Sequence, residues 1–286
     1  MIKLILLILI ILILSSCFIN TNEFTYNINE NYDNYKLDEN DRLYIKLQEL
    51  VFNEDHIYKH DIDLFNKYGE FHKWKNVRVL DAGTGFGRHY YQLPNDIEKI
   101  GVDKEELYLE RAEIKNPKGK FLLGKLEDYK LFEMESLTHI LCTMDTIYNN
   151  RPNEEMKDII SNFKFWLKKN GILAIHIYED TDNLDPMARD FSMIHEDEHR
   201  NKHSITYFNN FTHDAYFKKL EENLFSYVEK YIVPSGNSIN KSRNLHIIPK
   251  DKMIKLILDN NFELYQKVNL KTIGITDYSL YFFKKK

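Results

Sequence analysis

The sequence predicts an α/β fold in which a mostly parallel sheet carries helices on both faces. Across residues 77–178, short apolar runs typical of buried strands alternate with longer segments of helical spacing. This alternation is typical of parallel sheets, because the chain crosses the sheet between parallel strands and usually does so in a helix. The first apolar run ends in Gly83, Gly85 and Gly87, and polar residues follow the later runs. We therefore expect a ligand-binding crevice at the carboxyl ends of the strands.

Length and composition limit the possible functions. The 286 residues are enough for one large domain with a substantial core. The net charge is −5 and no dense basic run is present, which argues against nucleic acid as the partner. Two cysteines cannot form a disulfide framework.

Residues 1–20 form a hydrophobic segment that predicts a signal or membrane anchor. Residues 4–14 are unbroken Leu and Ile, the length of a signal-peptide core, and residues 14–17 resemble a bacterial lipobox that would lead to lipidation of Cys17. Extended to Ile19, the run is barely long enough to span a bilayer. A helix buried against the domain is the third alternative. We expect membrane attachment through this segment, on a side that the sequence leaves open, and a polar tether over residues 21–40.

Residues 41–68 carry apolar side chains at helical spacing and predict one or two helices ahead of the first strand. The apolar residues at 77–80 then predict a strand, and the glycines after it a tight loop, because glycine adopts positive φ and lets a ligand approach the backbone. The helix that follows should continue over residues 89–93 and end at Pro94.

The next elements follow the same alternation. We expect a strand at 97–102, a helix at 105–114 and a strand at 120–123, with a turn at 117–119 between the last two. A fourth strand is expected at 137–144. An amphipathic helix at 154–169 should stop at Asn170 and Gly171, a common helix terminator, before a fifth strand at 172–178.

The glycine spacing distinguishes between possible ligands. The loop reads G-x-G-x-G rather than the dinucleotide fingerprint G-x-G-x-x-G, and no phosphate-loop Gly-Lys-Ser/Thr is present. Asp81 stands just before the glycines, where it would repel a pyrophosphate. Asp103 follows the next strand, about 20 residues after the glycines. In nucleotide-binding folds an acid at this place accepts hydrogen bonds from a ribose diol.

Residues 80–87 resemble the first motif of the class I S-adenosylmethionine-dependent methyltransferases. The resemblance implies a Rossmann-like sheet of seven strands, mostly parallel, with an antiparallel last strand. It also implies S-adenosylmethionine as the cofactor. By pattern it covers residues 41–286, in which a helix at 250–260 and strands at 262–268 and 278–283 complete the fold.

The resemblance places the cofactor at the ends of four strands. In the family, an acid after the third strand binds the adenine amino group, but Lys125 stands there, so we assign that role to Glu127 or Asp128. The expected cofactor-binding residues are Asp81, Gly83, Thr84, Gly85, Gly87, Arg88, Asp103, Lys104, Leu126, Glu127, Asp128, Thr143 and Met144. In related enzymes the helices before the first strand cover the site, which makes Tyr44, His56, Tyr58 and His60 candidates for its lining.

Residues 179–245 form an insertion longer than the helix needed between the fifth and sixth strands. Alternating segments at 204–208 and 224–229 predict strands. Related small-molecule methyltransferases place an antiparallel cap here, so we predict a small antiparallel cap. Its possible substrate contacts are His176, Tyr178, Arg189, Tyr207 and Arg243.

Residues 195–199 match the zinc-protease motif H-E-x-x-H. That motif requires an apolar helix in a cleft, whereas here acids occupy both x positions and charged residues follow. His203 does not have the spacing of a third ligand. We interpret the segment as a solvated charged loop and expect no metal.

These observations predict a membrane-attached methyltransferase that transfers a methyl group to an oxygen or nitrogen of a small molecule. Positioning should provide most of the catalysis, and His176 and Tyr148 are the candidates for a general base. A protein or nucleic-acid methyltransferase is disfavoured, because residues 143–146 lack the Asn/Asp-Pro-Pro-Tyr/Phe motif. A non-catalytic membrane-anchored binding or scaffold protein with the same fold is the other alternative, supported by Lys125.

Overall fold

The computed structural model describes residues 39–52, 55–149, 152–181, 184, 192–270 and 278–286. The chain divides into two compact units, residues 1–42 and 43–286, and the second contains the sheets. The predicted hydrophobic segment, most of the predicted tether and Arg189 lie outside the described residues. No helix within those described ranges is both long and apolar enough to cross a bilayer.

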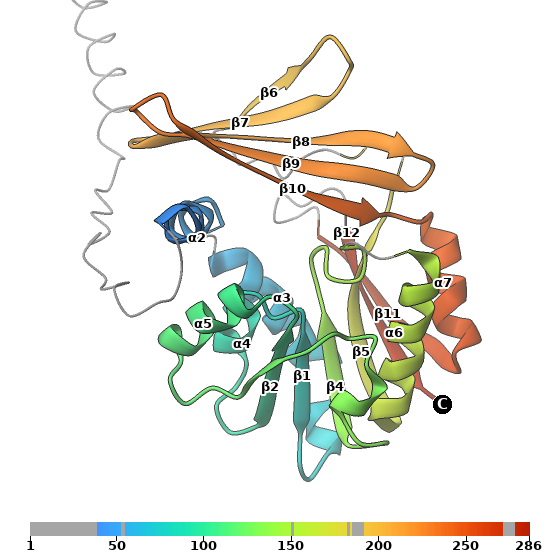
Figure 1. Cartoon of the computed structure of the whole chain (residues 1–286). Helices are drawn as coiled ribbons and strands as arrows, with labels where there is room; N and C mark the ends of the chain where they lie inside the picture. Colours follow the sequence, from blue (N-terminus) through green and yellow to red (C-terminus); the bar gives the residue numbers. More distant parts are fainter. Residues whose placement is uncertain (1–38, 53–54, 150–151, 182–183, 185–191, 271–277) are drawn as a thin grey trace, which may run out of the picture. The chain divides into compact units, whose positions relative to one another are not determined.

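The second unit contains a seven-stranded sheet in the order β11-β12-β5-β4-β1-β2-β3 (Figure 1). Its strands are β1 (Arg78–Ala82), β2 (Glu98–Asp103), β3 (Phe121–Leu123), β4 (Leu137–Cys142), β5 (Leu167–Tyr178), β11 (Phe262–Asn269) and β12 (Tyr278–Lys285). β12 pairs antiparallel with both β5 and β11, and β1 to β5 pair in parallel. The predicted sheet and its antiparallel last strand are confirmed. Strand order reverses between β1 and β4, which is where ligands bind in open α/β sheets.

Helices cover both faces of this sheet (Figure 1). They are α3 (Asp55–Tyr68), α4 (Arg88–Gln92), α5 (Glu106–Lys115), α6 (Asn153–Trp166) and α7 (Lys250–Asp259), with short 3-10 turns η1 (Phe71–Lys73) and η2 (Tyr129–Leu131). A further helix, α2 (Glu39–Val51), packs against the predicted cap. The central strands are apolar on both sides, and Val79, Leu80, Ile140 and Leu141 are fully buried. These runs form the core because both faces are covered.

One helix end differs from the sequence prediction. α6 ends at Trp166 and β5 begins at the next residue, so Asn170 and Gly171 do not terminate the helix. Trp166 is fully buried and its indole N–H donates to the Tyr129 carbonyl over 2.9 Å, which fixes where the chain leaves the helix. Asn170 adopts φ 64° inside β5, where the register with β4 shifts. Asparagine tolerates this conformation at a strand irregularity as well as at a helix end.

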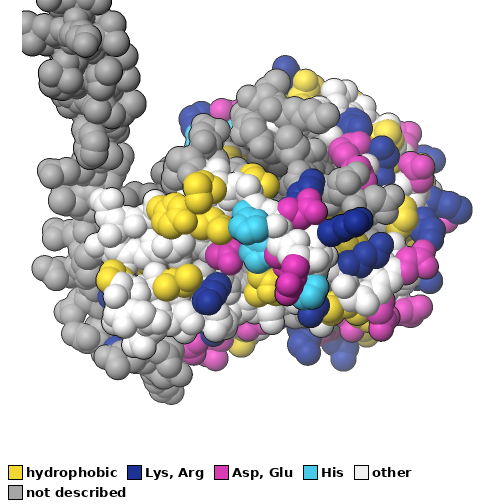
Figure 2. Space-filling view, turned by 90° about the horizontal axis from the view of Figure 1, so that it is seen from above, with side chains coloured by type: hydrophobic (Ala, Val, Ile, Leu, Met, Phe, Trp, Pro, Cys, Tyr) yellow, Lys and Arg dark blue, Asp and Glu magenta, His cyan; other side chains and the backbone are white. Residues whose placement is uncertain are grey.

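The predicted cap is a separate five-stranded antiparallel sheet in the order β10-β9-β8-β7-β6. Its strands are β6 (Met193–Glu196), β7 (Lys202–Phe208), β8 (Phe211–Glu221), β9 (Leu224–Ile232) and β10 (Ser238–His246). Phe211 and Tyr231 of the cap pack against Tyr44, Leu47 and Val51 of α2. Figure 2, seen from the side of the cap, shows hydrophobic, acidic, basic and histidine side chains intermixed on the surface.

The H-E-x-x-H segment is a hairpin end and not a helix. His195 and Glu196 close β6, and the Asp197 carboxylate accepts hydrogen bonds from the backbone N–H groups of His199 and Asn201. The two histidines therefore do not share a helix face, and the zinc-protease alternative is wrong. No group of three or more His, Cys, Asp or Glu side chains within the described ranges could hold a metal ion.

Candidate active site

A cavity of about 160 Å³ opens at the carboxyl ends of β1, β2 and β4, beside the reversal of strand order. It combines backbone of the glycine loop with side chains of the core and of the cap. Its lining residues are Gly83, Gly85, Val102, Asp103, Lys104, Glu105, Tyr108, Gly124, Leu126, Met144, Asp145, Thr146, Asn149 and Arg243.

The glycine loop forms the floor of this cavity. Gly83, Gly85 and Gly87 have φ of 70°, 53° and 74°, a region that favours glycine. A Cβ on Gly83 would lie 2.3 Å from the Thr146 Oγ1, so this glycine permits close packing. A Cβ on Gly85 would meet nothing within 4 Å. Gly85 therefore leaves space open for a ligand.

The two predicted acids at this floor have different positions. Asp81 is 2% exposed, accepts a hydrogen bond from the Thr84 Oγ1 over 2.6 Å and lies outside the cavity lining. Burial raises the pKa of Asp81. Asp103 lines the cavity; its Oδ2 accepts from the Gly85 N–H over 2.9 Å and its Oδ1 from the Glu105 N–H over 3.0 Å. Burial also raises the pKa of Asp103, although these backbone donors oppose the shift.

The loop after β3 reaches the cavity through Gly124 and Leu126. Glu127 and Asp128, to which we assigned the adenine contact, do not line it. Asp128 instead caps η2 by accepting a hydrogen bond from the Lys130 N–H over 3.0 Å. The Asp128 carboxylate is thus already satisfied by local backbone, and the adenine contact of Glu127 stays a prediction.

Gly87 and Arg88, which were also predicted to bind the cofactor, lie outside the cavity lining and support the glycine loop. Gly87 is the N-cap of α4, and the Arg88 guanidinium lies 4.7 Å from the Phe86 ring centroid and 5.5 Å from that of Tyr58. Of the candidates from the preceding helices, Tyr58 thus packs under the loop, and His56 is exposed.

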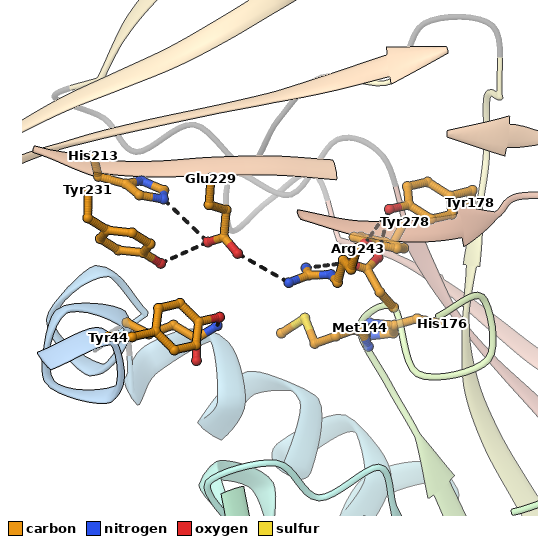
Figure 3. A network of polar contacts seen from close by, with 11 residues as sticks. Tyr44, Met144, His176, Tyr178, His213, Glu229, Tyr231, Arg243 and Tyr278 are labelled. Atoms are coloured by element: carbon orange, nitrogen blue, oxygen red, sulfur yellow. Dashed lines mark hydrogen bonds and ion pairs between the residues drawn. The ribbon is translucent and has the colours of Figure 1, made fainter. Parts of the chain in front are cut away.

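The opposite wall contains a charged network between the cap and the core (Figure 3). Arg243 of β10 donates from Nη2 to the Asp145 Oδ2 over 2.9 Å and from Nη1 to the Glu229 Oε2 over 3.3 Å. Its guanidinium lies 4.5 Å from the Tyr227 ring centroid. Glu229 is 2% exposed and also accepts from the Tyr231 hydroxyl over 2.9 Å.

The charges of this wall compensate one another. Burial tends to raise the pKa of Glu229, but the hydrogen bond with His213 and the charge of Arg243 outweigh it and lower that pKa. Asp145 accepts hydrogen bonds from the Tyr178 hydroxyl over 2.8 Å and from the Tyr278 hydroxyl. Each carboxylate thus has several donors, as buried charges require.

Asn149 completes this wall, and Tyr44 supports it from outside the lining. Tyr44 of α2 is hydrogen-bonded to Tyr108 of the lining, and burial raises its pKa. The Gln48 amide donates to the Tyr44 hydroxyl over 2.8 Å. The Asn149 Oδ1 is buried and has no hydrogen-bond partner among the described residues. A buried acceptor without a donor on a cavity wall is a place where a ligand can donate a hydrogen bond.

The two residues predicted as bases do not reach the cavity. Tyr148 and His176 are both fully buried and neither is part of the lining. The Tyr148 hydroxyl accepts from the Tyr178 N–H over 3.4 Å, and the His176 Nδ1 accepts from the Met144 N–H over 3.0 Å. We therefore correct that expectation: a general base must come within hydrogen-bonding distance of its substrate, and these side chains are enclosed by protein.

The residues predicted to contact the substrate do not all lie at the cavity. Arg243 lines the cavity and Tyr178 supports Asp145, whereas Tyr207 is 59% exposed on the cap. Sequence reasoning missed Tyr108, Asn149 and Glu229. A signal for Glu229 was present, because it is the one acid in the alternating series of Phe225, Tyr227 and Tyr231.

Comparisons with known proteins show the fold. The sequence matches no protein-family model and no curated protein. Among solved structures, an S-adenosylmethionine-dependent methyltransferase from Clostridium acetobutylicum has a TM-score of 0.67 and 15% identity, covering 85% of this chain and 99% of its own.

Two further solved structures have a similar fold. An amino pentose methyltransferase from Micromonospora echinaspora, solved with S-adenosylmethionine bound, has a TM-score of 0.65 and 12% identity over 85% of this chain and 97% of its own. A sugar N-methyltransferase from a Streptoalloteichus species has a TM-score of 0.60 and 14% identity over 86% and 92%. This protein therefore has the fold of the class I S-adenosylmethionine-dependent methyltransferases.

Proposed function

We propose that this protein is an S-adenosylmethionine-dependent methyltransferase that methylates an oxygen or nitrogen of a small molecule. One observation carries the proposal: the open space above Gly85 lies beside the Asp103 carboxylate, at the strand reversal. A cofactor with a ribose and no pyrophosphate fits this floor, because Asp103 can accept hydrogen bonds from a ribose diol. The fold of the neighbouring structures supports the same cofactor.

The cofactor supplies an electrophilic methyl group on a sulfonium. The residues that would hold it are Gly83 and Gly85 through the backbone, Asp103 through its carboxylate, and Leu126 through apolar contact. Asp145, also in the lining, would offer a negative charge to the cationic cofactor.

The charges of the lining favour a neutral or cationic acceptor. Asp103, Glu105 and Asp145 face Lys104 and Arg243, and Arg243 is already compensated by Asp145 and Glu229. An anionic acceptor would lie beside these carboxylates and be repelled. The name of one neighbour, a sugar N-methyltransferase, supports nitrogen as the acceptor atom in particular.

The chain's own residues would act chiefly by positioning. The acceptor must present its lone pair at roughly 3 Å from the methyl carbon, opposite the leaving sulfur. Asn149 and Arg243 can hold the polar groups of the acceptor. With an amine acceptor, the Asp145 carboxylate would stabilise the ammonium product, whose proton would pass to solvent.

Calorimetric titration of the full chain with S-adenosylmethionine and its demethylated product tests the cofactor. We expect micromolar binding that is lost in Asp103→Ala. A well-folded chain that binds neither compound would refute the enzyme and favour a binding or scaffold protein. Transfer of labelled methyl to matched amines and carboxylates then tests the acceptor, and faster methylation of the carboxylates would contradict the charge argument.

We also propose that residues 1–20 attach the protein to a membrane, on the evidence of the unbroken Leu and Ile run at 4–14. The full chain should sediment with membranes and resist extraction by alkaline carbonate. Cys17→Ser distinguishes the two routes, since a lipoprotein should incorporate labelled fatty acid that this variant no longer takes up, whereas a protein with a spanning helix should incorporate none. Recovery of the full chain from the aqueous fraction would contradict the proposal.

A further inference from the structure

Asp61 is a fully buried carboxylate in α3 that the proposed transfer does not use. Each of its oxygens faces a histidine. The Oδ2 lies 2.9 Å from the His89 Nε2, and the Oδ1 lies 3.3 Å from the His176 Nε2. The two imidazoles come from different elements, α4 and β5, so one carboxylate joins three parts of the core.

The second nitrogen of each imidazole points to the cavity wall. The His89 Nδ1 lies 3.2 Å from the Thr143 Oγ1, and the His176 Nδ1 accepts from the Met144 N–H over 3.0 Å. Thr143 and Met144 are consecutive residues after β4, and Met144 lines the cavity; Figure 3 shows His176 beside it. Asp61 is therefore linked by two parallel routes to the same short segment of the wall.

The chemistry of these bonds determines the tautomer of His176. The Met144 N–H can only donate, so the Nδ1 must be the acceptor and the proton must be on Nε2, facing Asp61. A carboxylate at Nε2 stabilises this tautomer. Asp61 thus favours the tautomer in which His176 can hold the Met144 backbone.

Met144 needs such an anchor because of its backbone conformation. Its φ is 53°, a left-handed conformation that costs a non-glycine residue roughly 1–2 kcal/mol. A strained residue keeps its conformation only when surrounding contacts impose it. The hydrogen bond to His176 is a contact of this kind.

We propose that Asp61, His89 and His176 form a positioning unit that sets the Thr143 and Met144 wall of the cofactor cavity. His176 is then a positioning residue, in place of the base expected from the sequence. The effect on cofactor affinity rests on the proposed function, but the effect on the Met144 backbone does not.

Two substitutions of His176 separate its two bonds. In His176→Asn the side-chain oxygen takes the place of Nδ1 and can still accept from the Met144 N–H, while the contact with Asp61 is lost. In His176→Gln the side chain reaches the Nε2 position and keeps the contact with Asp61, while the bond to Met144 is lost. The two variants are similar in polarity and each loses one buried hydrogen bond.

Two measurements on the full chain read out these variants. We expect His176→Gln to weaken binding of the demethylated cofactor about tenfold, and His176→Asn to change it less than about threefold, as expected for one hydrogen bond. Hydrogen exchange at the Met144 amide should be faster in His176→Gln than in His176→Asn. Thermal unfolding of both variants measures the purely structural cost.

A third variant and a control complete the experiment. Asp61→Asn should resemble His176→Asn, because its amide can place Oδ1 toward the His176 Nε2 and its NH2 group toward His89, whose Nδ1–H can then donate to the Thr143 hydroxyl. His139→Gln removes another buried imidazole of the core, which binds the Gly69 carbonyl, and should leave both readouts unchanged. Equal affinity and equal exchange in the two His176 variants would overturn the proposal. If the wild type binds no cofactor, the proposed function fails, and the exchange at Met144 still decides the positioning role.

Discussion

The floor and the opposite wall of the cavity are built in different ways. The floor consists of backbone from one short stretch of sequence, the glycine loop, with Asp103 from the next strand. The opposite wall consists of side chains from distant segments, among them Asp145 and Arg243, which Tyr44 and Glu229 support from outside the lining. The floor is thus a local structure, whereas the wall exists only after the cap and the core have packed.

This difference suits the floor and the opposite wall to recognise different ligands. Backbone N–H groups and a carboxylate can recognise an invariant part of a cofactor. Side chains on a separate sheet can change without disturbing the floor, which suits them to recognise the acceptor. If cofactor binding belongs to the floor and acceptor recognition to the wall, substitutions in each should change one of the two functions and spare the other.

The largest effect is expected at Gly85. Gly85→Arg places a long side chain in the open space and should lower cofactor affinity more than about 100-fold, because the side chain occupies the ligand's volume. Calorimetric titration measures this loss.

Gly236→Arg is the matched control. Gly236 lies in the turn before β10, has φ 85° and also has nothing within 4 Å of a Cβ, so it imposes a similar backbone strain without a cavity. Similar affinities in the two variants would show that the floor does not bind the cofactor.

Asp103 should have the next largest effect. Asp103→Asn removes the charge that would accept ribose hydroxyl groups, and we expect affinity to fall about 10- to 100-fold, the scale of hydrogen bonds to a charged group. Glu105→Gln changes a neighbouring acid of the lining and serves as the control. An equal loss in both variants would indicate a general charge effect and not a specific contact.

Arg243 tests the opposite wall. Arg243→Met should lower kcat/KM for the acceptor about tenfold or more, because a charged donor is lost, and change cofactor affinity less than about threefold. It also leaves Glu229 buried without its cation, so the variant should be less stable. Adding Glu229→Gln should restore part of the stability without restoring kcat/KM. A large loss of cofactor affinity would remove the distinction between the walls.

The smallest effect on the cavity is expected at His139, which lies in β4 away from the lining. Burial lowers the pKa of His139 to about 4. The unfolded chain therefore binds a proton near pH 6.5 that the native protein does not bind. The stabilisation should be complete above that pH and decrease by about 1.4 kcal/mol per unit as the pH falls toward 4.

Denaturant unfolding between pH 7 and 4 measures this slope, which should be smaller in His139→Gln. Cofactor affinity at pH 7 should be the same in both proteins. An unchanged slope would show that other groups cause the acid sensitivity.

Patterns close together in the sequence predicted most of the fold. The glycine loop, Asp103 and the alternation of strands and helices predicted the sheet and the cavity floor, because these features depend on local backbone and on burial of apolar runs. The helix end at Trp166 was missed because a tertiary hydrogen bond, from the indole to the Tyr129 carbonyl, fixes it. Asp128 caps η2 and His176 accepts a hydrogen bond from the Met144 N–H. Residue type alone does not identify these partners.

The sequence by itself determined the Rossmann-like sheet, the antiparallel cap and the position of the glycine floor. Only the tertiary structure decided which polar side chains meet. It placed Arg243 between Asp145 and Glu229 and enclosed His176 beneath Met144, which turned an expected base into a support of the wall. The physical reason is that side-chain chemistry in a folded protein depends on burial and on charged neighbours, and both are set by contacts between residues far apart in the chain.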